Sequence, residues 1–168
     1  MRVDGTRLIS TGSVNAKTGQ MFSFDFQSNF DNFYLGGEWA EFQLDRQCGS
    51  ITATSGACFG GNSFTVADTP TFHGWCVEGT WILTGETKPY TAQAITNEVG
   101  AFGNPIPSRP FSLDGESWGT WEIAARYSDT NLNYNPTQQL NAAISQLAGI
   151  TGGDERIVTL GLNWYMNR

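Results

Sequence analysis

The stretch WCVEGTWIL, residues 75–83, decides the fold class of this chain. Its large apolar side chains fall on alternate positions, and small or polar side chains fill most of the positions between them. Successive side chains of a β-strand point to opposite faces, so Trp75, Val77 and Trp81 share one face while Glu78 lies on the other. The pattern predicts a strand with one apolar face and one wetter face.

The same alternation recurs along the chain and predicts six strands. The expected ranges are 7–14, 20–29, 32–45, 72–85, 118–129 and 155–166. Glycine and proline lie mostly between these ranges, as turns require. Residues 137–149 place apolar side chains at helical spacing instead, which predicts a short helix in a connection. Residues 86–116 form a long link, and part of it, 90–102, is expected to extend strands or to pack inside a barrel.

Two fold classes produce alternation of this kind. A soluble β-sandwich also turns alternate residues inward. Aromatic residues near segment ends, such as Tyr127 and Trp164, instead suit the interfacial girdles of a transmembrane barrel. The segments, about 8 to 14 residues long, also suit tilted strands that cross a bilayer. We therefore predict an all-β fold that forms a single domain over residues 1–168, and these details favour an antiparallel transmembrane β-barrel segment over the sandwich.

Composition excludes several other classes. Of the 168 residues, 39% are hydrophobic, and no run approaches the roughly 18 consecutive apolar residues of a membrane helix. Sixteen acidic residues oppose nine basic ones, which gives a formal charge of -7. Because binding to phosphate backbones needs a basic surface, no nucleic-acid partner is expected.

The three cysteines and the single histidine give little support for metal or catalytic chemistry. Cys48 and Cys58 could close a Gly/Ser/Thr-rich loop as a disulfide in an oxidising compartment, or remain free thiols. Cys76 lies within a predicted strand and is expected to be a small packed residue. His73 has no paired cysteine motif near it, so no metal site is expected. Without a Gly-x-Ser-x-Gly elbow or a P-loop, we expect neither an enzyme nor a cofactor.

Five segments carry a resemblance to a known family. They read RVDGTRLISTGS (2–13), NFYLGGEWAEFQLDR (32–46), GWCVEGTWILTGETKPY (74–90), GTWEIAARYSDTNLN (119–133) and GGDERIVTLGLNWYMNR (152–168). In this order, and over nearly the whole chain, they resemble the phosphate-selective porins, the O and P porin family of Gram-negative outer membranes. The resemblance implies an antiparallel barrel of about sixteen strands, usually trimeric, through which anions such as phosphate diffuse passively.

The predicted strands fall short of a complete barrel of that family. Six strands are fewer than the roughly eight of the smallest single-chain barrels. The chain is therefore expected to be the C-terminal part of a porin, truncated at both ends. The expected partners are outer-membrane lipid, small anions or other solutes, and further copies in a homotrimer. The alternative that the residues leave open is a secreted β-sandwich that binds a glycan or a protein through an aromatic face.

If the apolar rows face lipid, the opposite rows line a pore. The charged residues of these rows are Asp25, Glu38, Glu78, Glu122 and Arg126. A phosphate pathway needs Arg and Lys side chains to replace the hydration of the anion, and this mostly acidic set does not supply them. The charges either pair across strands and brace the wall or contact permeating ions. The other basic residues considered are expected to be solvated or to contact lipid headgroups: Arg7, Arg46, Lys88, Arg109 and Arg156.

Overall fold

The computed structural model describes residues 8–14, 16–48, 66–91, 100–139, 141 and 147–167. The regular elements in this part of the chain are all β-strands, which confirms the all-β fold class. They are β1 (Thr18–Phe30), β2 (Phe33–Cys48), β3 (Val66–Asp68), β4 (Thr71–Ile82), β5 (Tyr90–Thr91), β6 (Ala101–Phe102), β7 (Thr120–Tyr134) and β8 (Ile150–Tyr165). No helix among the described residues is long and apolar enough to cross a membrane.

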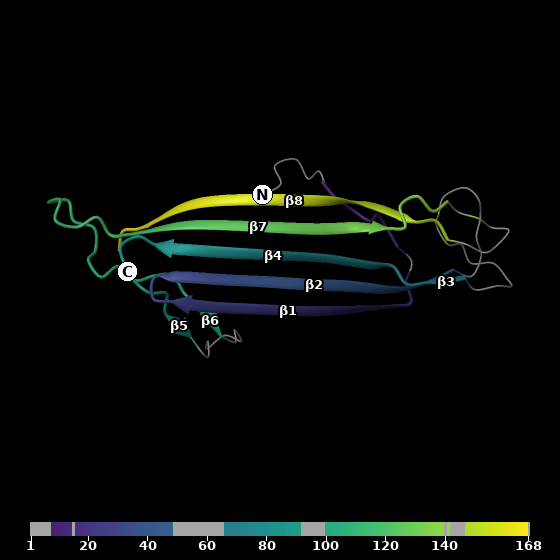
Figure 1. Ribbon diagram of the computed structural model, residues 1–168, viewed down its shortest axis with the longest axis horizontal. Coiled ribbons are helices and arrows are strands. Elements are labelled where there is room, and N and C mark those ends of the chain that lie inside the picture. Colours follow the sequence, from purple (N-terminus) through teal and green to yellow (C-terminus); the bar gives the residue numbers. More distant parts are fainter. Residues whose placement is uncertain are drawn as a thin grey trace. The chain divides into compact units, whose positions relative to one another are not determined.

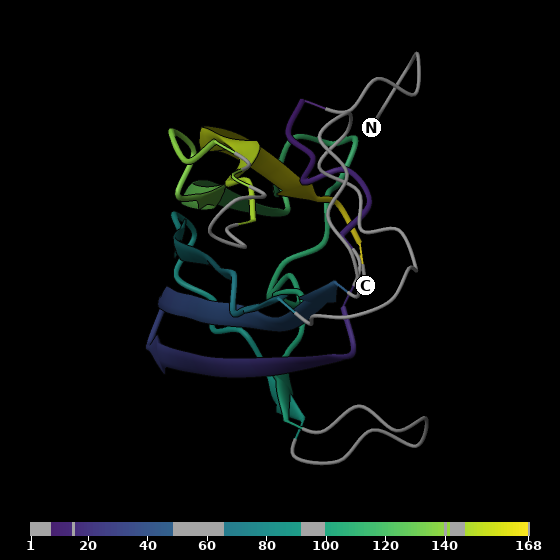
Figure 2. The same cartoon turned by 90° about the vertical axis from the view of Figure 1, so that its right-hand side faces the viewer.

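Six of the strands form one antiparallel sheet with the order β1-β2-β4-β7-β8, and β3 pairs with β2 beside this path (Figure 1). The register of the short pair places Arg46 opposite Asp68. β5 and β6 form a separate antiparallel pair, in which Tyr90 lies opposite Phe102. Its two strands lie side by side in both views (Figure 1 and Figure 2).

The turn between β1 and β2 is as short as the sequence predicts. Asp31 and Asn32 connect the two strands, and Asp31 has a φ of 52°. Asp and Asn tolerate this left-handed conformation better than most residues, which is why they are common in tight hairpins. The side-chain amide of Asn32 also donates to the carbonyl of Ile82 at 2.9 Å. The turn is thereby fixed to the end of β4.

Five of the six predicted strands are present as β1, β2, β4, β7 and β8. The strand predicted over 7–14 is wrong for residues 8–14, which form no strand. Gly12 has a φ of 69° there, and this left-handed conformation interrupts an extended chain. The predicted helix over 137–149 lies partly outside the described residues, and its described ends are not helical.

Contacts divide the chain into two compact units, and each long strand contributes one part to each of them. The first unit comprises Met1–Phe24, Trp39–Trp75 and Asp129–Arg156. Among its described residues Phe72, Leu147 and Ile150 are buried. The second unit comprises Asp25–Glu38, Cys76–Ser128 and Ile157–Arg168.

The interior of the second unit mixes apolar and polar side chains. Tyr34 and Ile82 are buried in it together with Thr120 and Glu122. A fully buried carboxylate is rare unless it is paired, so Glu122 directs attention to its surroundings. The candidate site described next lies within this unit.

Candidate functional site

The long strands carry exposed rows of apolar side chains. Trp81 of β4 is 49% exposed and Leu160 of β8 is 77% exposed, although both are large hydrophobic residues. The large apolar residues that alternate along these strands and are exposed are Phe22, Phe24, Phe26, Phe33, Leu35, Trp39, Trp75, Val77, Trp81, Leu83, Ile123, Val158, Leu160, Leu162 and Trp164. Apolar surface of this extent marks contact with lipid or with another protein. The residues between them point to the opposite face.

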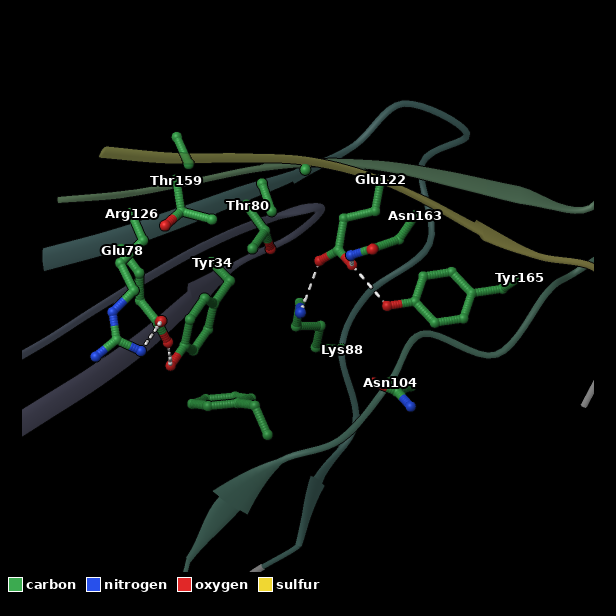
Figure 3. Close-up of a pocket in the computed structure, with 14 residues that line it drawn as sticks. Tyr34, Glu78, Thr80, Lys88, Asn104, Glu122, Arg126, Thr159, Asn163 and Tyr165 are labelled. Carbon is green, nitrogen blue, oxygen red and sulfur yellow. Dashed lines mark hydrogen bonds and ion pairs between the residues drawn. The ribbon is translucent and has the colours of Figure 1, made fainter. Parts of the chain in front are cut away.

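That opposite face borders a cavity of about 440 Å³ in the second unit (Figure 3). β2, β4, β7 and β8 each contribute to its lining, and so does the segment that connects β4 to β7. The lining residues that make ion pairs or hydrogen bonds with one another are Tyr34, Glu78, Lys88, Glu122, Arg126, Asn163 and Tyr165. The cavity is therefore polar and contains charges of both signs.

Glu122 of β7 is the most enclosed charge of the cavity, with a side chain only 1% exposed. Lys88 places its Nζ atom 2.6 Å from Oε1 of this carboxylate. Asn163 and Tyr165 of β8 donate hydrogen bonds to Oε2 at 3.0 and 2.7 Å. Hydrogen bonds to ionised groups are shorter and stronger than neutral ones, and together these three partners offset the loss of hydration.

Lys88 reaches Glu122 because the segment between β4 and β7 folds onto the polar face. Its backbone carbonyl accepts a hydrogen bond of 3.2 Å from the side chain of Asn29 in β1. Its ammonium also lies 5.2 Å from the ring centre of Tyr34, and Phe102 meets the same ring edge-on at 5.6 Å. The prediction that Lys88 is solvated or bound to lipid headgroups is therefore wrong, because its side chain is 13% exposed and ion-paired. Within the range 90–102, the described residue Phe102 packs on Tyr34 of the polar face, which agrees with one of the two expectations for this link.

Arg126 of β7 makes looser contacts than Lys88. One guanidinium nitrogen lies 3.7 Å from Glu78 of β4, and the other donates to the sulfur of Cys76 at 3.3 Å. The side chains of Arg126 and Glu78 are 51% and 37% exposed. Tyr34 donates to the second oxygen of Glu78 at 3.2 Å. A cross-strand ion pair of the expected kind is thus present, in a site open to solvent.

Asp25 and Glu38 lie on the same polar face. Together with Glu78 and Arg126 they line a smaller cavity of about 100 Å³. Both are exposed, and neither has an ion-pair partner among the described residues. The structure thus brings four of the five predicted pore-lining residues around one cavity, and Glu122 lines the larger one with Glu78 and Arg126.

The other basic residues differ in their surroundings. Arg46, expected to be solvated or to contact lipid headgroups, is 6% exposed in the first unit and pairs with Asp68, so that prediction is wrong. The pairing of β3 with β2 covers the end of β2 and explains this burial. Arg156 is 66% exposed and pairs with Asp129, and Arg109 is exposed. Arg7 lies outside the described residues.

The cysteines and possible metal ligands add no chemistry to the site. Cys58 and the side chain of Cys48 lie outside the described residues, so the possible disulfide falls there too. Cys76 is a free, half-buried thiol on the polar face. The part of the chain that the structure describes contains no cluster of three or more His, Cys, Asp or Glu side chains able to hold a metal ion.

Sequence reasoning missed three residues that organise the site: Tyr34, Lys88 and Tyr165. Tyr34 and Tyr165 alternate with the apolar rows, so the alternation of side chains along each strand could have placed them on the polar face. Lys88 lies 34 positions before Glu122 in a segment without periodicity, and no local signal connects the two.

Of the comparisons with known proteins, the one with protein families agrees with this geometry. No curated protein and no solved structure matches the chain. The family model for phosphate-selective porin O and P matches residues 1–168 of this chain, from its first residue to its last. This chain, with its antiparallel sheet of exposed apolar rows and a charged opposite face, belongs to the phosphate-selective porin O and P family.

Proposed function

We propose that this protein is a pore of the bacterial outer membrane through which small solutes, anions of the phosphate class among them, diffuse passively. Membership of the porin family implies an outer-membrane protein that acts as a channel rather than as an enzyme. The polar rows of the long strands would line the passage, and the apolar rows would face lipid.

The observation that carries this proposal is the division of single strands into two unlike faces. On β4, Val77 and Trp81 are exposed apolar residues, whereas Glu78 between them lines both cavities. A soluble sandwich would cover one of these faces with a second sheet and form an apolar core there. Here the covered face is polar, and most large apolar side chains among the described residues are exposed.

The charges of the polar face argue against strong anion selectivity from this part of the wall. Both cations that line the larger cavity are already paired, Lys88 with Glu122 and Arg126 with Glu78. Selective anion passage needs cations that are free to replace water around the ion. We therefore propose that this wall admits small solutes in general and favours cations weakly, through Asp25 and Glu38.

Two partners belong to the same proposal. The exposed apolar rows would contact outer-membrane lipid. The resemblance to the porin family supports a homotrimer, which chemical crosslinking in native membranes would reveal as a band of three chains.

A bilayer experiment with the complete gene product tests the proposal. The protein is inserted into a planar lipid membrane, and its current is recorded before and after a positively charged, membrane-impermeant thiol reagent is added. Because Cys76 lies on the polar face beside Arg126, we expect a stable conductance that the reagent lowers. The Cys76→Ser variant should conduct equally well and should not respond, which excludes reaction at Cys48 or Cys58.

Two outcomes would contradict the proposal. A protein that is folded and soluble without detergent, and that gives no conductance, would favour the secreted binding module. A conductance that is insensitive to the reagent, although mass spectrometry shows that Cys76 is modified, would place the polar face outside the passage.

A further inference from the structure

The pair of Lys88 and Glu122 is enclosed in a way that the other ion pair of this face is not. Its side chains are 13% and 1% exposed, against 51% and 37% for Arg126 and Glu78. Its distance of 2.6 Å is also shorter than the 3.7 Å of the exposed pair. An enclosed pair is screened little by salt, so its two charges remain coupled under conditions that separate exposed pairs.

The same pair is one of the places where the segment between β4 and β7 is attached to the strands. The backbone of Lys88 is held by Asn29 of β1, and its side chain is held by Glu122 of β7. The β5–β6 pair follows directly, and its Phe102 packs on Tyr34 of β2. Figure 3 shows Lys88 pointing from this segment toward Glu122, with Tyr165 on the other side of the carboxylate.

From these contacts we propose that Glu122 is a positioning residue that controls ion selectivity without contacting the ions. It holds Lys88, and with it the segment, against the polar face, and it cancels the positive charge of Lys88 within the passage. The inference rests on the proposed pore function and adds to it a residue that determines selectivity. Glu122 is suited to this role because Asn163 and Tyr165 fix its second oxygen, which keeps its first oxygen directed at Lys88.

Removal of the carboxylate charge therefore exposes a cation. In Glu122→Gln the neutral amide keeps nearly the same shape but no longer pairs with the ammonium, so Lys88 becomes available to anions. In Lys88→Met the negative charge of Glu122 is left without its partner, so the polar face becomes more favourable to cations. In the double variant both charges are absent, and selectivity returns toward that of the wild type.

The first readout is the reversal potential in a planar bilayer under a salt gradient. Glu38→Gln is the matched control, because Glu38 loses the same charge on the same face but has no ion-pair partner among the described residues. We expect Glu122→Gln to shift the reversal potential toward anions by more than Glu38→Gln does. We expect Glu122→Asp to stay closer to the wild type than Glu122→Gln.

The second readout does not depend on conductance. An amine-reactive reagent is applied to the folded protein, and mass spectrometry compares Lys88 with Lys17, the only two lysines of this chain. Lys17 is exposed and serves as the reference. We expect labelling of Lys88 relative to Lys17 to rise several-fold in Glu122→Gln and to stay near the wild-type level in Glu122→Asp.

The outcomes separate this inference from the proposed function. A shift in Glu122→Gln no larger than that in Glu38→Gln, or unchanged labelling of Lys88, overturns the role of Glu122. A folded wild type that gives no current refutes the pore and with it the selectivity role. If Glu122→Gln does not fold, Lys88→Met decides, because it keeps the bonds from Asn163 and Tyr165; an unchanged reversal potential in that variant overturns the proposal.

Discussion

Arg46 of β2 and Asp68 of β3 form an enclosed ion pair in which a guanidinium nitrogen lies 2.5 Å from a carboxylate oxygen. The two residues are direct partners in the register of their strands. Asp68 also accepts a hydrogen bond of 2.7 Å from the hydroxyl of Tyr134, and Arg46 donates to the carbonyl of Ala148 at 2.9 Å. One pair thus joins β2 and β3 to the end of β7 and to the residues before β8.

Replacement of Arg46 by Met should destabilise the fold strongly. The carboxylate of Asp68 would lose its counter-charge in an enclosed site, a change that typically costs roughly 3–5 kcal/mol. Urea unfolding of the protein in lipid vesicles measures the free energy of unfolding. Arg156→Met is the control, because Arg156 is 66% exposed and its ion pairs are expected to contribute about 1 kcal/mol or less. Equal losses in the two variants would show that enclosure of the Arg46 pair has no energetic effect.

Arginine should be far more destabilising on one face of β8 than on the other. Leu160 is 77% exposed in the apolar row, whereas Thr159 beside it lines the polar cavity. On a lipid-facing row near the bilayer midplane an arginine costs roughly 2–4 kcal/mol, and on a pore-facing row it is tolerated. We therefore expect Leu160→Arg to lower the free energy of unfolding in vesicles far more than Thr159→Arg. The opposite order would reverse the assignment of the two faces.

Alternation predicted the long strands well because each of them keeps one apolar row. The alternation predicts a strand over residues 72–85, and β4 spans Thr71–Ile82. The alternation predicts that the last strand starts at residue 155, whereas β8 begins at Ile150. Gly152 and Gly153 lie within this first part, and paired glycines give a turn signal rather than a strand signal. The strand forms there nevertheless, since it pairs with β7.

The polar face could be predicted only in part. Parity along each strand placed Glu78, Glu122 and Arg126 on one face, and the structure agrees. It could not reveal the partners, because Lys88 belongs to a connection with no period and Asp68 lies in a strand of only three residues. Contacts between residues distant in sequence depend on how the chain folds as a whole, and the local pattern does not contain that information.

Two glycines of β8 should respond differently to the same substitution. A Cβ atom on Gly152 would collide with the backbone carbonyl of Leu132 in β7, whereas on Gly161 it would meet only the Cβ of Ala124 at 3.7 Å, an ordinary contact. We expect Gly152→Ala to cost roughly 1–3 kcal/mol, since the backbone must shift to relieve the overlap. Gly161→Ala should change the free energy of unfolding by about 0.5 kcal/mol or less. Urea unfolding compares them, and a tolerated Gly152→Ala would mean that β7 and β8 separate easily at this point.

Glu86 lies outside the strands, and its carboxylate joins two parts of the segment between β4 and β7. The hydroxyl of Thr84 donates to one carboxylate oxygen, and the backbone and hydroxyl of Ser108 donate to the other at 3.2 and 2.7 Å. Burial alone would raise the pKa of Glu86, but these hydrogen bonds favour the ionised form and lower the pKa from 4.5 to about 2.

The protein should therefore become less stable in acid, because Glu86 becomes protonated. A carboxyl whose pKa is lower in the folded state stabilises the fold above its unfolded pKa, here 4.5, and loses that contribution as the pH falls toward 2. We expect the urea midpoint of the wild type to decrease over this interval and the midpoint of Glu86→Gln to decrease less, because an amide does not titrate. Glu116→Gln is the matched control, since Glu116 lies exposed in the same segment without an ion-pair partner among the described residues, and it should keep the acid dependence of the wild type. If the urea midpoints of wild type and Glu86→Gln depended equally on pH, the hydrogen bonds from Thr84 and Ser108 would not favour the ionised carboxylate.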